Sequence, residues 1–507
     1  MNFAMIFRIL GWMLLFEALF MSPSVLVGAV YREGDVIWLL FSMLVCAVAG
    51  ILFVVISRPK VRRIYAREGV VICALVWFLY SIFGALPFRL SGCIPDMFDA
   101  VFETASGFTT SGASILSDVE ALPHCMLFWR SFTHWVGGMG ILVFVMAIVP
   151  LAAGGSAMFL MKAESPGPSV KKMVPKASQT ASILYKMYLV ITVIELGLLL
   201  IGRMPWFDAC CLTFGTAGTG GFGVLNSSVG SYTIYQQVVI TIFMILFGTN
   251  FSAYYLIMLK KPKDIFKISE VRTYYGIIFA AIALITVNIL PMYANLGLAV
   301  KDAAFQVGSI ITTTGYSTTD VDLWPSFSKW ILVLLMFCGA CAGSTGGGIK
   351  VSRIQVAIKT IAKELDNAIH PNNVRKIKYD GKTLEHSVLR GINVFLVSYF
   401  LVMGASILLI SIDNFDLETN FTAVVATLNN IGPGLAGVGP VRNYSGYSAF
   451  STCVLIFDMI AGRLEILPVL VLFSAHTWRD GDMFTYQKRA SKSRMETESR
   501  ILDDFDI

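Results

Sequence analysis

Four short segments of this chain share one pattern, in which glycine and residues with hydroxyl or amide side chains follow an apolar helical stretch. The segments are Thr109–Gly112, Thr216–Gly221, Thr312–Gly315 and Asn429–Gly432. A single segment of this kind is usually a loop or a helix cap. Four of them, spaced roughly a hundred residues apart, indicate an internal repeat. We infer a pore that is lined by four related but unequal loops.

The composition places the chain in a membrane, because 56% of its 507 residues are hydrophobic and only 14% are charged. Apolar windows of about 20 residues, the length that crosses a bilayer, recur about ten times. They are Phe3–Val30, Val36–Ile56, Gly69–Leu86, Phe128–Leu151, Ala181–Ile201, Gln236–Leu259, Tyr274–Leu290, Trp330–Ala342 with its continuation, Val388–Ile410 and Tyr447–Leu472. We therefore expect an all-α polytopic membrane protein with about ten transmembrane helices. The first window lacks a clear cleavage site, so we interpret it as a helix rather than a signal peptide.

Basic residues collect before the third, fifth, seventh and ninth apolar windows, while the alternate connections are acidic. Lysine and arginine near the ends of spans stay on the cytoplasmic side. Both termini are therefore predicted to be cytoplasmic. The net charge of +6 is mainly a topology signal, and nucleic acid is not an expected partner.

After the first two spans, each repeat contains a span, an external loop, a short helix, a glycine-bearing segment and a second span. The short helices, too short to cross the bilayer, are predicted at Pro95–Ala105, Trp206–Thr216, Lys301–Thr312 and Glu418–Leu428. The predicted division is an N-terminal two-helix pair at 1–66, pore repeats at 67–175, 176–268, 269–380 and 381–480, and a cytoplasmic tail at 481–507.

Irregular backbone survives at membrane depth only when it is buried in protein or lines a wet cavity. Four re-entrant segments around one axis would satisfy this condition. Each short helix would direct the negative end of its dipole toward the axis, and the carbonyls beyond it could replace the hydration shell of a cation. Glycine allows backbone angles that expose those carbonyls. The pattern therefore favours a cation pore.

Longer motifs around these segments make a resemblance specific. They are Phe102–Ala113, Phe128–Gly140, Thr219–Phe222, Gly248–Phe251, Thr313–Thr318, Gly343–Lys350, Asn429–Gly434 and Gly462–Pro468. The chain resembles the TrkH/KtrB family, within the superfamily of K⁺ transporters, over nearly its whole length. Its extra span pair before the first repeat is similar to the TrkH and TrkG members rather than to KtrB.

The resemblance implies that K⁺ is the transported ion and that backbone carbonyls of four filters bind it, with no organic cofactor. The filter residues it implies are Thr110, Ser111, Gly112, Thr219, Gly220, Gly221, Thr313, Thr314, Gly315, Asn430, Ile431 and Gly432. The second filter has Ala217–Gly218 where others have hydroxyls, and the fourth offers Asn429 and Asn430. Exact four-fold equivalence is therefore not expected.

Within the stretch Cys338–Lys350, the four glycines Gly343 and Gly346–Gly348 interrupt an otherwise apolar helix, each costing about 1 kcal/mol of helix stability relative to alanine. One interpretation is a close helix crossing, and the other is a break that moves. The resemblance favours the second and implies an intramembrane gate. Its residues would be Gly343, Ser344, Thr345, Gly346, Gly347, Gly348 and Lys350. A phosphate-binding loop is excluded, because Ile349 stands where lysine must follow glycine.

Arg463 lies within the last apolar window with Asp458 and Glu465. Ionisable groups at that depth usually face a partner or a cavity. Arg463 is thus either part of a structural ion pair or a cation in the permeation path. The resemblance favours the second role and adds Arg463 to the gate. Arg130 and Glu103 are predicted to form a structural pair behind the first filter.

No group of residues in the sequence supports catalysis or a resident metal. The nine cysteines are scattered through apolar stretches and the five histidines are dispersed. No nucleophile has a credible base, so we do not expect an enzyme.

The cytoplasmic segments Ala152–Thr180, Ala362–Lys382 and Arg479–Ile507 are too short for a nucleotide-binding domain but long enough to dock one. The resemblance implies a homodimer in contact with membrane lipid, and a cytosolic TrkA-like ring that binds NAD(H) or ATP/ADP. The expected function is K⁺ uptake across the bacterial inner membrane through a gated, K⁺-selective pore. The alternative is a K⁺ symporter coupled to H⁺ or Na⁺, which inverted repeats would favour, whereas the repeats here share one orientation.

Overall fold

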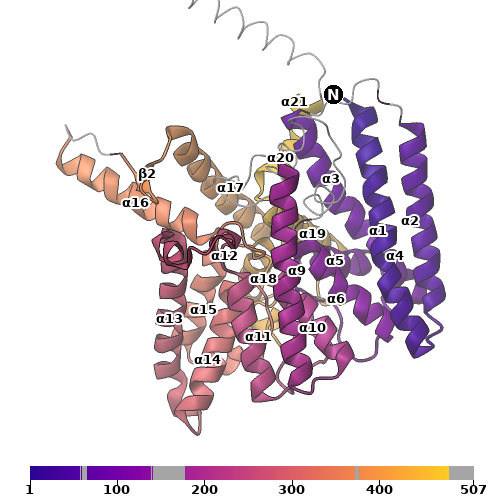
Figure 1. The fold of residues 1–507 in the computed structure, drawn as a ribbon, viewed down its shortest axis with the longest axis horizontal. Helices are drawn as coiled ribbons and strands as arrows, with labels where there is room; N and C mark the ends of the chain where they lie inside the picture. The colour runs from indigo at the N-terminus through magenta and orange to yellow at the C-terminus, as the bar shows by residue number, and fades with distance from the viewer. Residues whose placement is uncertain (58, 60–64, 139, 141–176, 372–375, 479–507) are drawn as a thin grey trace, which may run out of the picture.

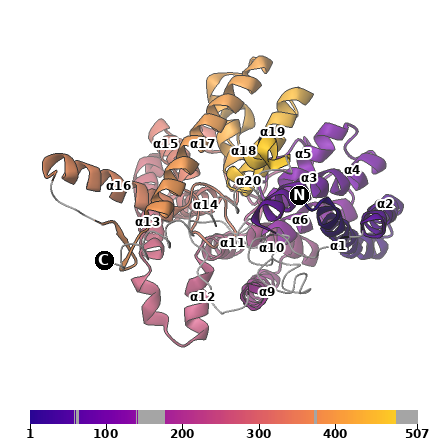
Figure 2. The same ribbon diagram turned by 90° about the horizontal axis from the view of Figure 1, so that it is seen from above.

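The computed structural model describes residues 1–57, 59, 65–138, 140, 177–371 and 376–478. The predicted second half of the fourth apolar window, most of the segment Ala152–Thr180 and the C-terminal tail lie outside these residues. Figure 1 shows a bundle in which the long helices run side by side. In both ribbon views the N-terminal helices lie at one edge and α16 projects from the opposite edge (Figures 1 and 2).

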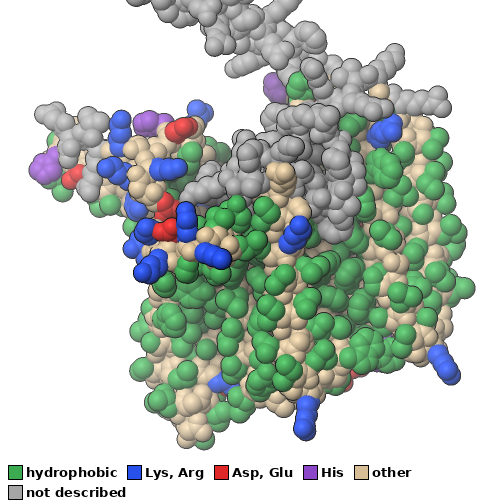
Figure 3. Space-filling model, in the orientation of Figure 1, with side chains coloured by type: hydrophobic (Ala, Val, Ile, Leu, Met, Phe, Trp, Pro, Cys, Tyr) green, Lys and Arg blue, Asp and Glu red, His purple; other side chains and the backbone are tan. Residues whose placement is uncertain are grey.

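Six helical stretches among the described residues are long and apolar enough to cross a membrane. The helices in them are α1 (Phe3–Tyr31), α2 (Val36–Ile56), α3 (Ala66–Gly84) continued by α4 (Leu86–Ser91), α9 (Ala177–Ile201), α13 (Ser269–Ile289) and α17 (His386–Ile410). Hydrophobic side chains cover the visible flank of the bundle, and lysines and arginines lie near its two ends (Figure 3). An apolar surface of this extent fits lipid rather than water. The chain is therefore an integral membrane protein with several apolar helices.

Four shorter helices overlap the predicted ones, although the third begins at Leu296, five residues before the predicted Lys301. They are α5 (Met97–Thr109), α10 (Trp206–Gly218), α14 (Leu296–Ile311) and α18 (Leu417–Leu428). Side-chain oxygens cap three of them, since Asp96, Asn295 and Asp416 accept backbone N–H groups of the first turn. The C-terminal halves of all four helices are buried. Each short helix thus enters the bundle and ends inside it.

Three of the predicted spans are broken. The first is α11 (Ile234–Phe247) with α12 (Phe251–Met258), which meet at 90°. The second is α15 (Ser326–Cys338) with α16 (Val351–Ile369), and the third is α19 (Ala449–Arg463) with α20 (Leu467–Phe473). Only the second break is predicted from the sequence. The expectation of continuous helices at Gln236–Leu259 and Tyr447–Leu472 is wrong.

Tertiary contacts accompany one of the two breaks that the sequence analysis does not predict, and unusual backbone angles mark the other. At the first break, the carbonyl of Gly248 accepts the N–H of Cys341 at 3.0 Å, and the side chain of Asn250 caps α12. At the other, Glu465 and Ile466 both have positive φ, 58° and 64°. Such angles are rare for residues with a Cβ and end a helix.

The remaining described elements include α6 (His124–Gly138), which contains the described half of the fourth predicted span, and several short connecting segments. The others are α21 (Ala475–Trp478), the short 3-10 helices η1 (Pro262–Lys267), η2 (Leu290–Met292), η3 (Val321–Leu323), η4 (Ser411–Asp413) and η5 (Ala436–Val438), and the antiparallel strands β1 (Lys378–Tyr379) and β2 (Lys382–Thr383). The strands form a hairpin after α16, in which Lys378 pairs with Thr383.

Candidate functional site

The backbone takes the same path after each of the four short helices. One residue adopts the left-handed conformation, with φ between 54° and 59°, and the glycine two positions later also has positive φ. The pairs are Thr110 and Gly112, Thr219 and Gly221, Thr313 and Gly315, and Asn430 and Gly432. A left-handed threonine is costly and persists only where its surroundings require it. A left-handed threonine follows three of the four short helices, which indicates that the loops share one backbone conformation.

Hydrogen bonds cap each short helix in the same way. The N–H of Thr110 donates to the carbonyl of Gly107, and the next N–H, that of Ser111, donates to Ser106 at 2.9 Å. The fourth loop repeats this arrangement, since Ile431 donates to Ala426 at 2.8 Å. Bonds of this type end a helix and redirect the chain.

The carbonyl oxygens that follow these caps are available for a ligand. Within the described part of the chain, hydrogen bonds to the filter backbone reach only one carbonyl, that of Gly432, which accepts the hydroxyl of Tyr444 at 2.7 Å. The carbonyls without such a bond belong to Thr110, Ser111, Gly112, Thr219, Gly220, Gly221, Thr313, Thr314, Gly315, Asn430 and Ile431. Buried carbonyls are nearly always paired in proteins. A dense set of unpaired ones therefore points to an ion or water as their partner.

The four loops touch one another in a closed ring. Each filter glycine lies so close to the backbone of a neighbouring loop that a Cβ in its place would overlap an oxygen atom. The distance from that Cβ position to the oxygen is 2.1 Å for Gly112 and Gly220, 1.9 Å for Gly221 and Thr314, 2.0 Å for Gly315 and Ile431, and 2.6 Å for Gly432 and Ser111. The first loop thus meets the second, the second the third, the third the fourth, and the fourth the first. All twelve predicted filter residues belong to this ring.

Side chains make the walls of the ring unequal, as the sequence indicates. In the first loop the hydroxyls of Thr109 and Ser111 lie 3.0 Å apart. In the fourth, the amide of Asn430 donates to the Ser111 hydroxyl and to the Met459 carbonyl, each at 2.8 Å. The fourth loop is therefore tied by its side chain to the first.

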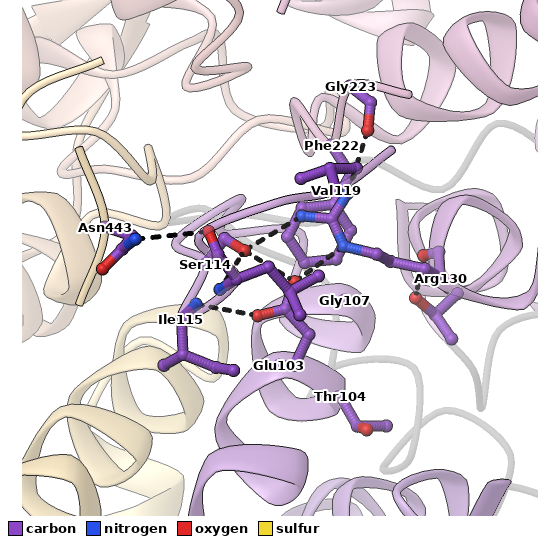
Figure 4. Close-up of polar contacts among 12 residues, drawn as sticks. Glu103, Thr104, Gly107, Ser114, Ile115, Val119, Arg130, Phe222, Gly223 and Asn443 are labelled. Carbon is purple, nitrogen blue, oxygen red and sulfur yellow. Dashed lines mark hydrogen bonds and ion pairs between the residues drawn. The ribbon is translucent and has the colours of Figure 1, made fainter. Parts of the chain in front are cut away.

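A buried ion pair supports the first two loops from behind (Figure 4). Arg130 Nε donates to Glu103 Oε1 at 2.6 Å, and neither side chain is more than 3% exposed. The guanidinium also donates to the Gly223 carbonyl at 3.0 Å and lies 3.5 Å over the Phe222 ring. The second carboxylate oxygen of Glu103 accepts the N–H of Ile115 at 3.0 Å. The predicted pair of Arg130 with Glu103 is confirmed. It connects the chain segments that follow the first and second loops.

His134 is a supporting residue that the sequence reasoning missed. Its Nδ1 lies 2.7 Å from the Gly107 carbonyl, and its Nε2 lies 3.3 Å from the N–H of Phe222. These contacts fit an imidazole that donates from Nδ1 and accepts at Nε2. The available signal was its position four residues after Arg130 on α6, which places both on one helix face.

Replacing Glu103 with glutamine is expected to destabilise the protein strongly. The substitution leaves the Arg130 guanidinium buried without its counter-ion, which costs about 3–5 kcal/mol. Thermal unfolding of the purified protein in detergent measures the change. The control is Glu364→Gln, since Glu364 is 63% exposed and pairs with Lys363 at 3.4 Å on the surface. A transition for Glu103→Gln that matches the control would show that the buried pair contributes little.

The loop between α15 and α16 lies against the ends of the third and fourth short helices. The N–H of Gly347 donates to the Thr313 hydroxyl at 2.7 Å. A Cβ on Gly347 would lie 2.3 Å from the Asn429 carbonyl, and one on Gly346 would lie 2.7 Å from the Thr312 carbonyl. The loop therefore packs directly against the ring, where the third and fourth short helices end.

The break between α11 and α12 holds this loop in place. Besides the bond from Cys341 to Gly248, the N–H of Phe251 donates to the Gly343 carbonyl at 3.0 Å. At the start of α13, Glu270 accepts the N–H of Ala342 at 2.7 Å and that of Ser352 at 3.2 Å. One carboxylate therefore accepts hydrogen bonds from both ends of the loop.

Arg463 connects the loop to the ring. As the last residue of α19, it donates from Nη1 to the Thr345 carbonyl at 2.9 Å, and the Thr110 hydroxyl lies 3.4 Å from the same nitrogen. Its Nη2 donates to the Gly138 carbonyl at the end of α6, at 2.8 Å. The ammonium of Lys350 donates to the Gly346 carbonyl. The structure thus brings the predicted gate residues together beside the filter.

The two acidic neighbours of Arg463 contact other groups. Glu465 forms an ion pair with Arg353, whose guanidinium lies 4.0 Å from the centre of the Phe395 ring. Asp458 accepts the hydroxyl of Ser406 at 2.7 Å. Among the described residues, no group of three or more His, Cys, Asp or Glu could hold a metal ion. The ring of carbonyls is thus the strongest candidate site in the described part of the chain.

Comparison with known proteins gives one consistent family. The profile of the TrkH family, described as a cation transport protein, matches residues 36–480. The Trk system potassium uptake protein TrkH of Escherichia coli (strain K12) is 35% identical over 490 residues, which cover 95% of this chain and 100% of that protein. TrkG of the same strain is 30% identical, over 92% of this chain and 97% of its own. The crystal structure of the potassium transporter TrkH from Vibrio parahaemolyticus superposes with a TM-score of 0.84 at 32% identity, covering 94% of this chain and 100% of that one.

Proposed function

This chain belongs to the TrkH family of cation transport proteins, and from that membership we propose that it takes up K⁺ through a gated, K⁺-selective pore. The proposed setting is the bacterial inner membrane, crossed about ten times, with both termini in the cytoplasm. The proposed architecture is an N-terminal helix pair followed by four pseudo-symmetric repeats around one pore. Relatives over the whole chain are named potassium uptake proteins, which supports K⁺ as the transported ion.

The observation that carries the proposal is the ring of carbonyls without hydrogen bonds. Potassium gives up its water readily only where oxygen atoms replace the hydration shell. Four short helices end at the ring, and the carbonyl end of each carries about half a negative elementary charge. Both effects favour a cation at the axis and disfavour an anion.

The proposed gate consists of the loop Gly343–Gly348, Lys350 and Arg463. The loop packs on the ring, and two cationic side chains accompany it. A positive charge beside a narrow pore raises the energy of a passing cation, most strongly where water is scarce. We propose that this arrangement is closed and that the loop moves aside when the pore conducts.

The proposed regulation and assembly come from the resemblance to the family. A cytosolic TrkA-like ring that binds NAD(H) or ATP/ADP would dock on the segments Ala152–Thr180 and Ala362–Lys382 and on the C-terminal tail, and the chain would form a homodimer. The helix α16, which contains the first residues of the segment Ala362–Lys382, projects from the bundle (Figures 1 and 2), and this supports docking there.

A coupled K⁺ symporter is the second candidate, and a flux experiment separates the two. Purified protein is reconstituted into vesicles with a K⁺ gradient, with and without an imposed pH or Na⁺ gradient. With a conducting pore, the K⁺ gradient alone is enough to drive Rb⁺ uptake. We therefore expect uptake in every condition, including those without a second gradient. Uptake only in the presence of the second gradient would identify a symporter and overturn the pore proposal.

A further inference from the structure

A groove on the outer flank of the bundle lies apart from the filter and the gate. It is a cavity of about 550 Å³ between α15, α17 and α18, which is within the usual size range of small-molecule sites. Its walls are apolar and include Val333, Ile407 and Phe421. The helix surface around it is also apolar and exposed, since Leu334 is 66% and Leu408 75% exposed. The groove therefore opens toward the lipid.

One cation and one anion lie in this apolar groove. Lys329 on α15 and Glu418 on α18 both line it, and Lys329 Nζ lies 3.9 Å from Glu418 Oε1. This separation is longer than a hydrogen bond, so each group retains capacity for a further partner. Trp330, which also lines the groove, is 62% exposed. Tryptophan beside lysine is typical of the headgroup level of a bilayer.

The start of α15 adds to this end of the groove. The helix α15 begins at Ser326, which also lines the groove, and its N-cap Pro325 makes no side-chain cap bond. A helix N-terminus favours a phosphate group. A phosphate near Lys329 would therefore also benefit from the α15 dipole, while an ammonium would be favoured by Glu418.

We propose that this groove binds a phospholipid with an ethanolamine headgroup. Its phosphate contacts Lys329, its ammonium donates to Glu418, and one acyl chain lies along the apolar walls. The paired charges at the groove are what select this lipid. A choline headgroup has no N–H to donate to the carboxylate, and a glycerol headgroup has no cation.

The floor of the groove connects the lipid to the fourth filter. Thr422 and Leu435 both line the groove, and the N–H of Leu435 donates to the Thr422 hydroxyl at 2.9 Å. A Cβ on Gly434 would lie 2.8 Å from that hydroxyl. Leu435 follows the filter glycine Gly432 by three residues, so an acyl chain in the groove steadies the limb that leaves the fourth filter. This second step rests on the proposed function, whereas lipid binding does not.

Native mass spectrometry of the full-length protein tests the binding. Phosphatidylethanolamine, phosphatidylcholine and phosphatidylglycerol with identical acyl chains are each added to protein stripped of lipid. We expect the ethanolamine lipid to be retained preferentially. Lys329→Gln and Glu418→Gln should each weaken its binding about tenfold, because each removes a charge-assisted hydrogen bond. The control Lys267→Gln removes a lysine that is 79% exposed and pairs with Asp264 at 2.7 Å outside the groove.

A groove-filling variant, Ile407→Trp, keeps both charges and is expected to displace the acyl chain. Equal retention of the three lipids, or unchanged retention in both charge variants, would overturn the proposal. A change in oligomeric state with Ile407→Trp and no change in lipid retention would assign the groove to an interface between copies. In vesicles, we expect K⁺ uptake to fall a few-fold when phosphatidylcholine replaces the ethanolamine lipid. Loss of K⁺ uptake in every lipid with retained lipid binding would contradict the proposed function and leave the lipid site standing.

Discussion

Replacing Gly315 with serine is expected to abolish most of the discrimination between K⁺ and Na⁺. The backbone of Gly315 has φ of 86°, a conformation that costs a residue with a Cβ about 1–2 kcal/mol. The added Cβ would lie 2.0 Å from the Ile431 carbonyl oxygen and 2.8 Å from the ring of Pro433. Because the third and fourth loops are in contact at this point, the Ile431 carbonyl of the fourth loop must move.

A displaced carbonyl changes how the ring replaces the water around the ion. A change of 1.4 kcal/mol in relative ion binding alters selectivity tenfold, so we expect the K⁺/Na⁺ ratio to fall at least that far. Competition of Na⁺ with Rb⁺ uptake into vesicles measures the ratio. The control is Gly276→Ser on α13, because a Cβ on Gly276 meets no atom within 4 Å. An unchanged ratio in Gly315→Ser would remove this residue from the filter.

Replacing Arg463 with glutamine is expected to raise K⁺ flux about tenfold in the absence of any cytosolic partner. The guanidinium holds the loop through the Thr345 carbonyl and holds the end of α6 through the Gly138 carbonyl. Hydrogen bonds from charged groups contribute about 1.5–3 kcal/mol each. Their loss weakens the closed arrangement, and the loss of positive charge beside the pore lowers the barrier to a cation.

Rb⁺ uptake per reconstituted protein, measured without a regulatory subunit, checks this expectation. The matched control is Arg272→Gln, since Arg272 is an exposed arginine on α13. Shortening the loop within Ser344–Gly348 should raise flux in the same way while keeping Arg463. Flux at the level of the unmodified protein in both variants would show that the loop and Arg463 do not close the pore.

The sequence predicts the existence of the four short helices and the glycines with positive φ that follow them, because these features depend on local chemistry. Glycine is needed where the backbone has positive φ and another chain lies in contact, as at Gly221 and Gly432. The starts predicted at Trp206 and Glu418 lie within one residue of the observed ones, whereas the third helix begins five residues before the predicted Lys301, since Asn295 caps it earlier. The pairing of Arg130 with Glu103 follows from the cost of leaving either charge alone in an apolar interior.

Local chemistry does not predict the break at Gly248, whereas Pro468 at the start of α20 is a local signal for the break at Glu465. A single glycine costs a helix only about 1 kcal/mol, which tertiary contacts can override in either direction. Here the contacts favour the break, since the Gly248 carbonyl accepts a hydrogen bond from Cys341, far away in sequence, and Glu270 binds the same loop 72 residues along the chain. The role of His134 is hidden for the same reason, because both of its partners lie on other elements.

The side-chain differences among the four filters are evident in the sequence, but their shared backbone is not. Asn430 has the same left-handed conformation as Thr110, although asparagine and threonine differ in shape and polarity. The cap bonds and the neighbouring loop determine that conformation more than the side chain does. A residue-by-residue comparison of the filters therefore underestimates how alike they are in space.

The closed ring of filter contacts also has an evolutionary consequence. A pore built on one polypeptide can in principle alter a single wall, which a ring of identical subunits cannot do. Here each glycine leaves room for an oxygen of the adjacent loop, and residues in contact do not respond independently to substitution. Divergence of one wall is therefore constrained first by its immediate neighbour. Inherited changes in the filter should accumulate as compensating pairs across the contacts between adjacent loops.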